Sequence, residues 1–193
     1  MTYEKEKCLL SFDLSTITCG YSIFSFEEKK LKKLDYFKFT KKELWERAIE
    51  LEAFVDKLLS EYNIIMFAIE ERLKSFRAGG TNAEAMLKTA TMNFFCQVYF
   101  RKKGIDVKEI HVSTARKLAI PMFHSIARKI AGKKQKEIAF DFIVKELGAE
   151  IFPKKVMKAG KRKGEEVFLE EASDMSDSYI LGKSALIIYP FEK

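Results

Sequence analysis

The sequence predicts an α/β fold built on one mixed five-stranded sheet, with three antiparallel strands followed by parallel strands and with helices on both faces. Three short apolar segments, separated by turn-sized stretches, come first. Apolar runs then alternate with helix-like segments, the order expected when helices connect parallel strands. A chain of 193 residues, 47% of them hydrophobic and 33% charged, has the size and composition of one globular unit. We therefore expect a single domain over residues 1–193.

The first half of the chain supplies four of the expected strands. Residues 8–12, 20–26 and 31–39 are apolar, partly β-branched or aromatic, and predict an antiparallel meander. Residues 41–62 repeat apolar side chains at spacings of three and four, which is typical of an amphipathic helix. Residues 64–69 (IIMFAI) form a continuous apolar run, as expected for a buried parallel strand after its connecting helix.

Helix signals dominate the second half. Thr81 and Glu84 have the spacing of a capping box, Ser113 is a candidate N-cap that precedes Pro121, and Gly148 stands where a C-terminal cap belongs. The expected elements, in chain order, are a helix over 82–101, a strand over 105–112, a short helix from 113 to 118, a helix over 133–147 and a last helix over 173–188. Residues 121–132 are expected to be a connector.

Charge is unevenly distributed along the chain, whose formal net charge is +7. Residues 1–100 balance to zero, residues 101–163 carry 18 basic and 6 acidic side chains, and residues 164–193 carry 2 and 7. A positive middle next to an acidic end favours a polyanion surface beside a carboxylate site, although a solvated lysine-rich surface is the alternative. Pro153, Gly160 and many lysines predict an exposed basic loop or ribbon at about 150–168.

Several classes of protein fit this sequence poorly. Cys8, Cys19 and Cys96 have no C-x-x-C spacing and cannot all pair, which argues against a disulfide framework or a zinc finger and favours the cytoplasm. No apolar run is long enough for a membrane span, so we expect no membrane partner. A phosphate-binding loop at Gly182 fails because the glycine required five positions earlier is Asp177. No small-molecule cofactor is expected.

Four acids stand out. Apolar strands run directly into Asp13 and Glu70, and Asp174 and Asp177 lie three residues apart on one face of the last helix. If the first and fourth strands are parallel neighbours, their acids emerge at one sheet edge, where open α/β sheets bind ligands. Clustered carboxylates require a cation, and oxygen ligands suit Mg²⁺ or Mn²⁺. Two such ions about 4 Å apart hold the attacking and leaving oxygens of a phosphodiester displacement.

Each acid also has a purely structural interpretation. Asp13 can be a residue of the turn that ends a strand, and Glu70 can begin a solvated turn with Glu71. Asp174 and Asp177 can favour the positive end of a helix dipole. For each acid taken alone, the structural interpretation explains the residue at least as well as a catalytic one. Taken jointly, two acids after buried strands and a pair on one helix favour a site.

The segments FDLSTITCGYSI, AIEE and SDMSDSYIL resemble, in order and spacing, the motifs of RuvC-type Holliday-junction resolvases of the ribonuclease H-like superfamily. The resemblance spans nearly the whole chain and implies a ribonuclease H-like fold. It implies that Asp13, Glu70, Asp174 and Asp177 bind two Mg²⁺ ions, with Mn²⁺ possible, in an endonuclease that acts as a homodimer on four-way DNA junctions. The segment GKKQKE resembles the stretch that supplies a catalytic lysine, which we assign to Lys134, with Lys133 and Lys136 as the alternatives.

Two further sets of residues are expected to contact partners. The DNA-binding set consists of basic side chains near the acids, the basic segment and one aromatic residue: Arg72, Lys74, Phe76, Arg77, Arg116, Lys117, Lys133, Lys136, Lys154, Lys155, Lys158, Lys161, Arg162 and Lys163. The helix over 82–101 is apolar around most of its circumference, which favours a dimer interface or cover by the connector at 121–132. The expected interface residues are Met86, Ala90, Phe94, Phe95 and Val98.

The sequence departs from the bacterial members of the family in two places. The family has an aromatic residue shortly after the second acid, where this chain has Leu73, with Phe76 three residues later. The long basic segment before the last helix looks like an addition, and these differences resemble phage-encoded members. The expected function is resolution of four-way or branched DNA junctions by paired phosphodiester hydrolysis. The alternatives are a nuclease acting on flaps or RNA–DNA hybrids, and a noncatalytic protein that binds branched DNA.

Overall fold

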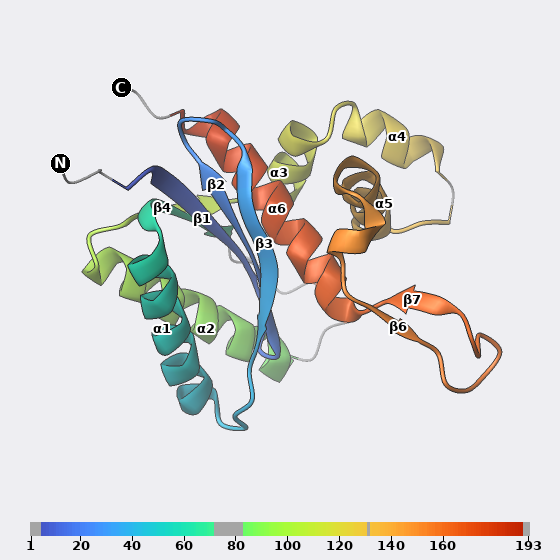
Figure 1. Cartoon of the computed structure of the whole chain (residues 1–193), viewed down its shortest axis with the longest axis horizontal. Coiled ribbons are helices and arrows are strands. Elements are labelled where there is room, and N and C mark those ends of the chain that lie inside the picture. The colour runs from blue at the N-terminus through green and yellow to red at the C-terminus, as the bar shows by residue number, and fades with distance from the viewer. Residues whose placement is uncertain (1–4, 72–82, 131, 191–193) are drawn as a thin grey trace.

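The computed structural model describes residues 5–71, 83–130 and 132–190. A five-stranded sheet, six α-helices and a small two-stranded sheet make up this part of the chain (Figure 1). The strands of the large sheet are β1 (Lys7–Leu14), β2 (Thr18–Ser25), β3 (Leu31–Lys38), β4 (Asn63–Glu70) and β5 (Asp106–Ile110). The helices are α1 (Leu44–Glu61), α2 (Ala83–Lys102), α3 (Val112–Ala119), α4 (Phe123–Lys129), α5 (Gln135–Leu147) and α6 (Glu170–Ile188), and the small sheet pairs β6 (Lys154–Val156) with β7 (Glu166–Phe168).

The large sheet has the order β3-β2-β1-β4-β5, which confirms the predicted mixed sheet. β1, β2 and β3 are antiparallel, whereas β1 pairs in parallel with β4, and β4 in parallel with β5. Phe12 lies opposite Ile69 in the β1–β4 register. The next residues, Asp13 and Glu70, therefore reach the same edge of the sheet.

Helices cover both faces of the sheet, and the alternation of strand side chains separates two cores. Phe12, Phe67 and Phe100 of α2 belong to the core under α1 and α2. Leu9 and Ala68 belong to the opposite core, which α3, α5 and α6 complete. Because side chains alternate, Asp13 and Glu70 follow Leu9 and Ala68 onto the α6 side.

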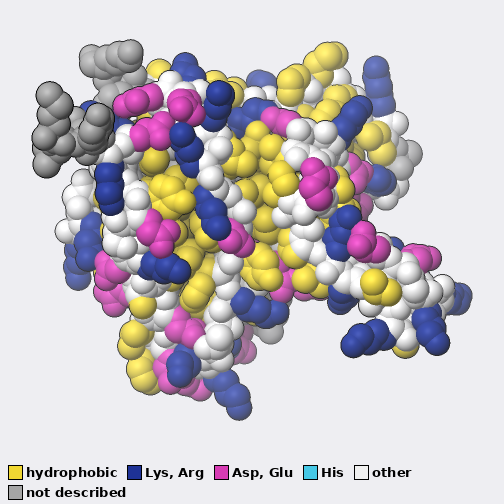
Figure 2. Space-filling model, viewed as in Figure 1, with side chains coloured by type: hydrophobic (Ala, Val, Ile, Leu, Met, Phe, Trp, Pro, Cys, Tyr) yellow, Lys and Arg dark blue, Asp and Glu magenta, His cyan; other side chains and the backbone are white. Residues whose placement is uncertain are grey.

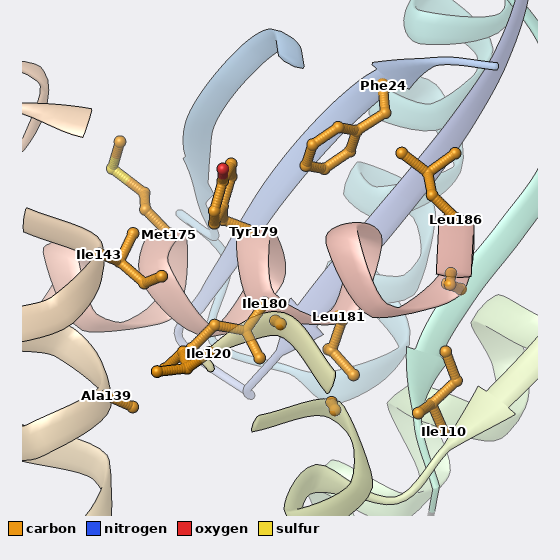
Figure 3. Packing of buried hydrophobic residues seen from close by; sticks show 14 of the residues in the cluster. Phe24, Ile110, Ile120, Ala139, Ile143, Met175, Tyr179, Ile180, Leu181 and Leu186 are labelled. Atoms are coloured by element: carbon orange, nitrogen blue, oxygen red, sulfur yellow. The ribbon is translucent and has the colours of Figure 1, made fainter. Parts of the chain in front are cut away.

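Helix α6 is the central element of the second core, and Figure 3 shows Met175, Tyr179, Ile180 and Leu186 along it among side chains of the neighbouring elements. Small strand residues let this helix approach the sheet closely. The Ser11 and Ser22 hydroxyls donate to the carbonyl of Ser178 at 2.8 and 3.0 Å. A Cβ on Gly182 would clash with the ring of Phe24. This close approach sets the height of the acids of α6 above the sheet.

Three sequence expectations require correction. The connector at 121–132 contains α4, whose Phe123 is buried in the α6 core. It therefore does not cover α2, whose Met92 and Cys96 belong to the other core. The N-cap of α3 is His111, whose Nδ1 accepts from the Ser113 N–H at 3.2 Å, so Ser113 itself lies inside the helix. Helix α6 begins at Glu170, almost a turn before residue 173.

The basic segment forms a hairpin. β6 and β7 pair in antiparallel fashion, and the hairpin projects beyond the body of the molecule next to the start of α6 (Figure 1). The expected ribbon at about 150–168 is therefore present. No helix in the described ranges is long and apolar enough to span a membrane.

Candidate active site

Acids from three elements converge at one end of the sheet. β1 carries Asp13, β4 ends at Glu70, and α6 crosses above them with Asp174 and Asp177 one turn apart. The charges of Asp177, Asp174 and Glu70 all raise the pKa of Asp13, which shows that the four carboxyl groups share one electrostatic environment. The structure thus brings together the four acids that the sequence singled out.

The position of Asp174 is fixed by two contacts with β2. Gly20 lies against its backbone, where a Cβ would come within 2.2 Å of the Asp174 carbonyl oxygen. The Thr18 hydroxyl donates a hydrogen bond to Oδ2 of Asp174. Thr18 is in turn held in the β1–β2 turn, where its N–H donates to the Ser15 hydroxyl at 2.9 Å. Thr18 was not among the residues expected from the sequence.

Two positively charged side chains, those of Lys136 and Arg116, lie among the acids. Nζ of Lys136, near the start of α5, is 3.2 Å from Oδ2 of Asp177 and 3.6 Å from Oδ1 of Asp174. Nη2 of Arg116 on α3 donates to the other Asp177 oxygen, Oδ1, at 3.2 Å. Both side chains of the Arg116–Asp177 pair are close to nine-tenths buried. Charge-assisted pairs in such surroundings are much less screened than surface pairs.

Burial and mutual repulsion dominate the electrostatics of the acids. Burial raises the pKa of Asp13 well above its usual value, the negative charge of Asp177 adds to this, and Lys136 opposes it. Burial also raises the pKa of Glu70, partly offset by Arg116, and the pKa of Asp174, partly offset by the Thr18 hydrogen bond. Neighbouring carboxylates disfavour one another's ionisation, so the cluster favours any cation placed within it.

For Lys136, burial and the neighbouring carboxylates act on the pKa in opposite directions. Burial disfavours its charged form, but the carboxylates of Asp177, Asp13 and Asp174 outweigh that effect and raise the pKa of Lys136. Its ammonium group is therefore charged at neutral pH and balances part of the negative charge of the acids.

Polar side chains of α2 hold the end of β4. Nδ2 of Asn93 donates to the backbone carbonyl of Glu70 at 3.2 Å. Nε2 of Gln97 donates to Oδ1 of Asn93 at 2.7 Å, and Arg101 donates to Oε1 of Gln97 at 2.9 Å. Asn93 and Gln97 are buried although they lie on an otherwise apolar helix face. Polar residues four positions apart among apolar ones were a sequence signal for this chain of hydrogen bonds, and it was missed.

A pocket of about 460 Å³ opens beside Asp174. Its lining comes from the β1–β2 turn, the end of β3, α5 and the first turns of α6: Ser15, Ile17, Thr18, Lys38, Lys136, Glu170, Glu171, Ser173 and Asp174. Lys38 donates to Oε1 of Glu171 at 2.8 Å on its rim. Of the four acids, Asp174 lines this pocket, which lies at the first turns of α6.

The donor set determines which metal the site suits. It contains carboxylate oxygens and no cysteine or histidine ligand, which matches the preference of Mg²⁺ and Mn²⁺ for hard oxygen donors. Within residues 5–71, 83–130 and 132–190, however, no group of three or more acidic, cysteine or histidine side chains is arranged to hold a metal ion. Two of the four acids face Lys136 and Arg116 instead. The residues fit a divalent cation in charge and chemistry.

By position, the structure favours Lys136 over Lys134 as the lysine of the site. Lys134 is the N-cap residue of α5, with its N–H donating to Oε2 of Glu137 at 3.0 Å. Lys133 lies 2.7 Å from Asp141 on the exposed side of the same helix. Lys136, which we had placed in the DNA-binding set, is the lysine that reaches the acids. Lys136 lies two residues after Lys134, which places it on the other side of the first turn of α5, and the lysine-rich sequence does not reveal the helix phase.

The other expected DNA-binding residues are spread over several places. Arg116 lies at the acids, and Lys117 is exposed on α3. The hairpin segment from β6 to β7 contains the six basic residues of the predicted ribbon, Lys154, Lys155, Lys158, Lys161, Arg162 and Lys163. Arg72, Leu73, Lys74, Phe76 and Arg77 lie outside the described residues.

Comparison with solved structures identifies the fold. Thermus thermophilus RuvC in complex with Holliday junction substrate aligns over 95% of this chain and 97% of its own, with a TM-score of 0.58 and 12% identity. Another T. thermophilus RuvC structure gives 0.56 at 13% identity, with the same coverage. The yeast mitochondrial Holliday junction resolvase Ydc2 aligns over 91% of this chain and 76% of its own, with a TM-score of 0.55 and 15% identity.

Sequence comparison adds nothing to this likeness, since no protein-family model and no curated protein matches the chain. At 12–15% identity, the structural likeness establishes the fold alone. The strand order and directions of the mixed sheet agree with it. The chain has the ribonuclease H-like fold shared by RuvC and the mitochondrial resolvase Ydc2.

Proposed function

We propose that this protein is a metal-dependent endonuclease that cuts four-way DNA junctions. The observation that carries the proposal is the convergence of Asp13, Glu70, Asp174 and Asp177 at the open edge of a sheet whose fold matches a RuvC bound to a Holliday junction. The structural interpretation of each acid fails to explain why three elements bring all of them together. Burying acids against one another costs free energy that turn or helix-capping residues would not incur.

The four acids would hold one or two Mg²⁺ or Mn²⁺ ions. When bound, the metal would polarise the scissile phosphate and lower the pKa of the attacking water. With a cation held by the acids, the basic side chains of Lys136 and Arg116 would lie near the phosphate. Nε of Arg116 is buried and has no acceptor within the described part of the chain, so this group retains a donor for a phosphate oxygen.

Lys136 and Thr18 have separate tasks in this proposal. Lys136, charged at neutral pH, would stabilise the negative charge that develops on the phosphate during displacement. Thr18 holds Oδ2 of Asp174, which leaves Oδ1 facing Lys136. Holding one carboxylate oxygen orients the other toward its ligand.

A cleavage assay tests the function directly. Purified protein is incubated with labelled four-way junction, flap, linear duplex and RNA–DNA hybrid, each with Mg²⁺ or with chelator. We expect paired nicks in the junction that require Mg²⁺. Preferred cleavage of flaps or hybrids would assign the second nuclease function, and junction binding without cleavage would assign a noncatalytic role.

Amide variants link the activity to these acids. Glu70→Gln and Asp174→Asn remove a charge while nearly preserving shape, so we expect cleavage to fall at least 100-fold while junction binding persists. Asp106→Asn, at an exposed acid of β5 that pairs with Lys108, is the matched control and should cut like the parent. Wild-type cleavage in both site variants would refute the assignment of the acids.

We further propose that the enzyme is a homodimer through the outer side of α2. Leu87 and Phe94 on this helix are 65% and 55% exposed, and α4 lies on the opposite face of the sheet. Of the other expected interface residues, Met86, Ala90, Phe95 and Val98 are half-buried, and Phe95 stacks on Tyr99 at 6.3 Å between ring centroids. A two-fold axis at α2 would present two acid clusters to two strands.

Sedimentation at micromolar concentration distinguishes a dimer from the 22.4 kDa monomer. Leu87→Glu places a charge in the proposed interface and should yield monomers that nick junctions singly. Ile49→Glu, at a 55% exposed apolar residue of α1, is the matched control and should remain dimeric. A monomeric parent that makes paired nicks in one binding event would refute the dimer.

A further inference from the structure

The β6–β7 hairpin is a separate structural unit beside the acids. Lys154, Lys155 and Val156 pair with Phe168, Val167 and Glu166, and neither strand joins the large sheet. Figure 1 shows the hairpin extending away from the body, with its base at the start of α6. At about 3.3 Å per residue, the distance from residue 154 to the turn near residue 160 is at most about 20 Å.

The base of the hairpin is anchored to the body. Phe168 of β7 packs edge-on against Phe140 of α5 at 5.0 Å between centroids, and Phe140 packs on the buried Phe152 at 5.5 Å. The N–H of Leu169 donates to the carbonyl of Pro153 at 2.9 Å. A two-stranded hairpin alone is marginally stable in water, and this aromatic cluster provides the missing support. The base therefore has a fixed position relative to α6.

The tip of the hairpin is positively charged. Lys158, Lys161 and Lys163 are exposed and form no ion pair within the described ranges, whereas Arg162 pairs with Glu165 at 2.6 Å. Figure 2 shows basic side chains gathered over this projection. Like charges on a small turn repel one another, which gives no benefit to folding. Their arrangement instead matches a ligand that carries regularly spaced negative charges.

The hairpin and the acids are connected by a short stretch of helix. β7 leads directly into α6, and Asp174 lies four residues along that helix, about 6 Å from its first residue. The pocket beside Asp174 lies at this stretch, and Lys38 and Lys136 line it together with the acids Glu170, Glu171 and Asp174. A polyanion that reaches the acids through this pocket passes the base of the hairpin.

We propose that the β6–β7 hairpin is a DNA-binding arm whose tip lysines contact the phosphates of a duplex arm outside the site of cleavage. That the polyanion is DNA rests on the proposed nuclease function. The tip offers ammonium groups and no planar hydrogen-bonding side chain other than the paired Arg162, so the contacts are to phosphates and carry little sequence information. The arm increases affinity for substrate and holds a duplex while the pocket receives the strand to be cut.

The test compares salt dependence of binding in two matched triple variants of the full-length chain. K158Q/K161Q/K163Q removes the tip charges. K29Q/K57Q/K102Q removes three exposed lysines at the opposite end of the large sheet, and each variant lowers the net charge by the same amount. Binding of a fluorescent four-way junction is measured in chelator from 50 to 200 mM salt, so that no cleavage occurs.

We expect the slope of log affinity against log salt to fall by about 2.7 in the tip variant, at about 0.9 per phosphate contact. Over the fourfold salt range, its affinity should then fall about 40-fold less than that of the parent. The control variant should keep the parent slope. The proposal would be overturned if the tip variant kept the slope of the parent. It would also be overturned if the tip variant and the control variant showed the same reduction in slope.

A second design guards against a folding artefact. The N–H of Met157 donates to the carbonyl of Glu165 at 2.9 Å, so residues 158–164 can be replaced by Asn-Gly, which favours a two-residue hairpin turn. The variant with this shortened hairpin should show the same reduction in salt slope as the tip variant and should melt at the same temperature as the parent.

Different experimental results would refute the DNA-binding arm and the proposed nuclease function. A parent that binds but cuts no junction, with a slope loss in both hairpin variants, refutes the nuclease and leaves the arm. A parent that cuts junctions, with unchanged slopes in both variants, refutes the arm and leaves the nuclease.

Discussion

Gly20 and Asp174 meet backbone to backbone: a Cβ on Gly20 would lie 2.2 Å from both the carbonyl carbon and the carbonyl oxygen of Asp174. Strand β2 and helix α6 therefore contact each other at the first acid of the helix. No side chain at position 20 fits this approach unless the helix moves. The glycine thus ties the packing of α6 to the placement of its acid.

Gly20→Ala should consequently disturb both stability and the site. Overpacking against backbone atoms costs about 1–3 kcal/mol, which for a chain of this size lowers the melting temperature by about 3–10 °C. Gly182→Ala meets the side chains of Phe24 and Ser11 rather than backbone, so we expect a smaller loss. Thermal unfolding of both variants provides the comparison. A Gly20→Ala protein as stable as the parent would show that the helix is not held at this distance.

The position of Lys136 leads to a prediction that separates it from Lys134. Removing its ammonium group leaves Asp174 and Asp177 with less compensation, so Lys136→Met should lower the melting temperature in chelator. Added Mg²⁺ should restore much of the loss, because a cation among the acids replaces the missing charge. Lys134→Met, at an exposed N-cap, should match the parent in both conditions. If Lys134→Met lowered the melting temperature in chelator and Lys136→Met did not, Lys134 would be the lysine at the acids.

Much of the site was predictable because its acids follow patterns that also define the fold. Asp13 and Glu70 end apolar runs, and parallel pairing of those runs is enough to place them together. The separation of Asp174 and Asp177 by three residues is enough to place them on one helix face. These inferences needed only strand order and helix periodicity.

Other features depend on tertiary details that the sequence does not display. Met122 adopts a positive φ of 57° at the start of α4, so the helix after Pro121 has no ordinary cap signal. Helix α6 begins at Glu170 because acids in a first turn favour the helix dipole, and this signal was overlooked beside the basic segment. Lys136 reaches the acids only because α5 begins at Gln135, and helix boundaries are the least certain result of periodicity.

The raised pKa of Asp13 predicts a pH-dependent effect on stability. In chelator, burial and the negative charge of Asp177 make the ionised form unfavourable in the folded protein. The folded state therefore holds a proton that the unfolded chain releases above a pH of about 4, and stability falls as pH rises from there through the folded pKa. Asp13→Asn removes this loss and should raise the melting temperature at pH 7.

The gain from Asp13→Asn should shrink as pH falls toward about 4, where the aspartic acid is neutral in both states. Mg²⁺ should reverse the order at pH 7, because the parent binds it more tightly than the variant does. Melting curves between pH 4.5 and 8, with chelator and with Mg²⁺, check both statements. A gain that is independent of pH would mean that packing, and not ionisation, distinguishes the two proteins.

Asn93 links the packing of α2 to the backbone at Glu70, and its removal should affect both. Asn93→Ala leaves the Glu70 carbonyl without its donor and Nε2 of Gln97 without its acceptor, at a cost of about 1–3 kcal/mol in unfolding free energy. Because the end of β4 is then less firmly held, we also expect slower junction cleavage at saturating Mg²⁺. Thr91→Ala is the control, since that exposed hydroxyl donates to the Leu87 carbonyl of its own helix. Urea unfolding and single-turnover cleavage measure the two effects. A variant that loses stability but cleaves at the parent rate would limit Asn93 to packing and leave Glu70 positioned by β4 alone.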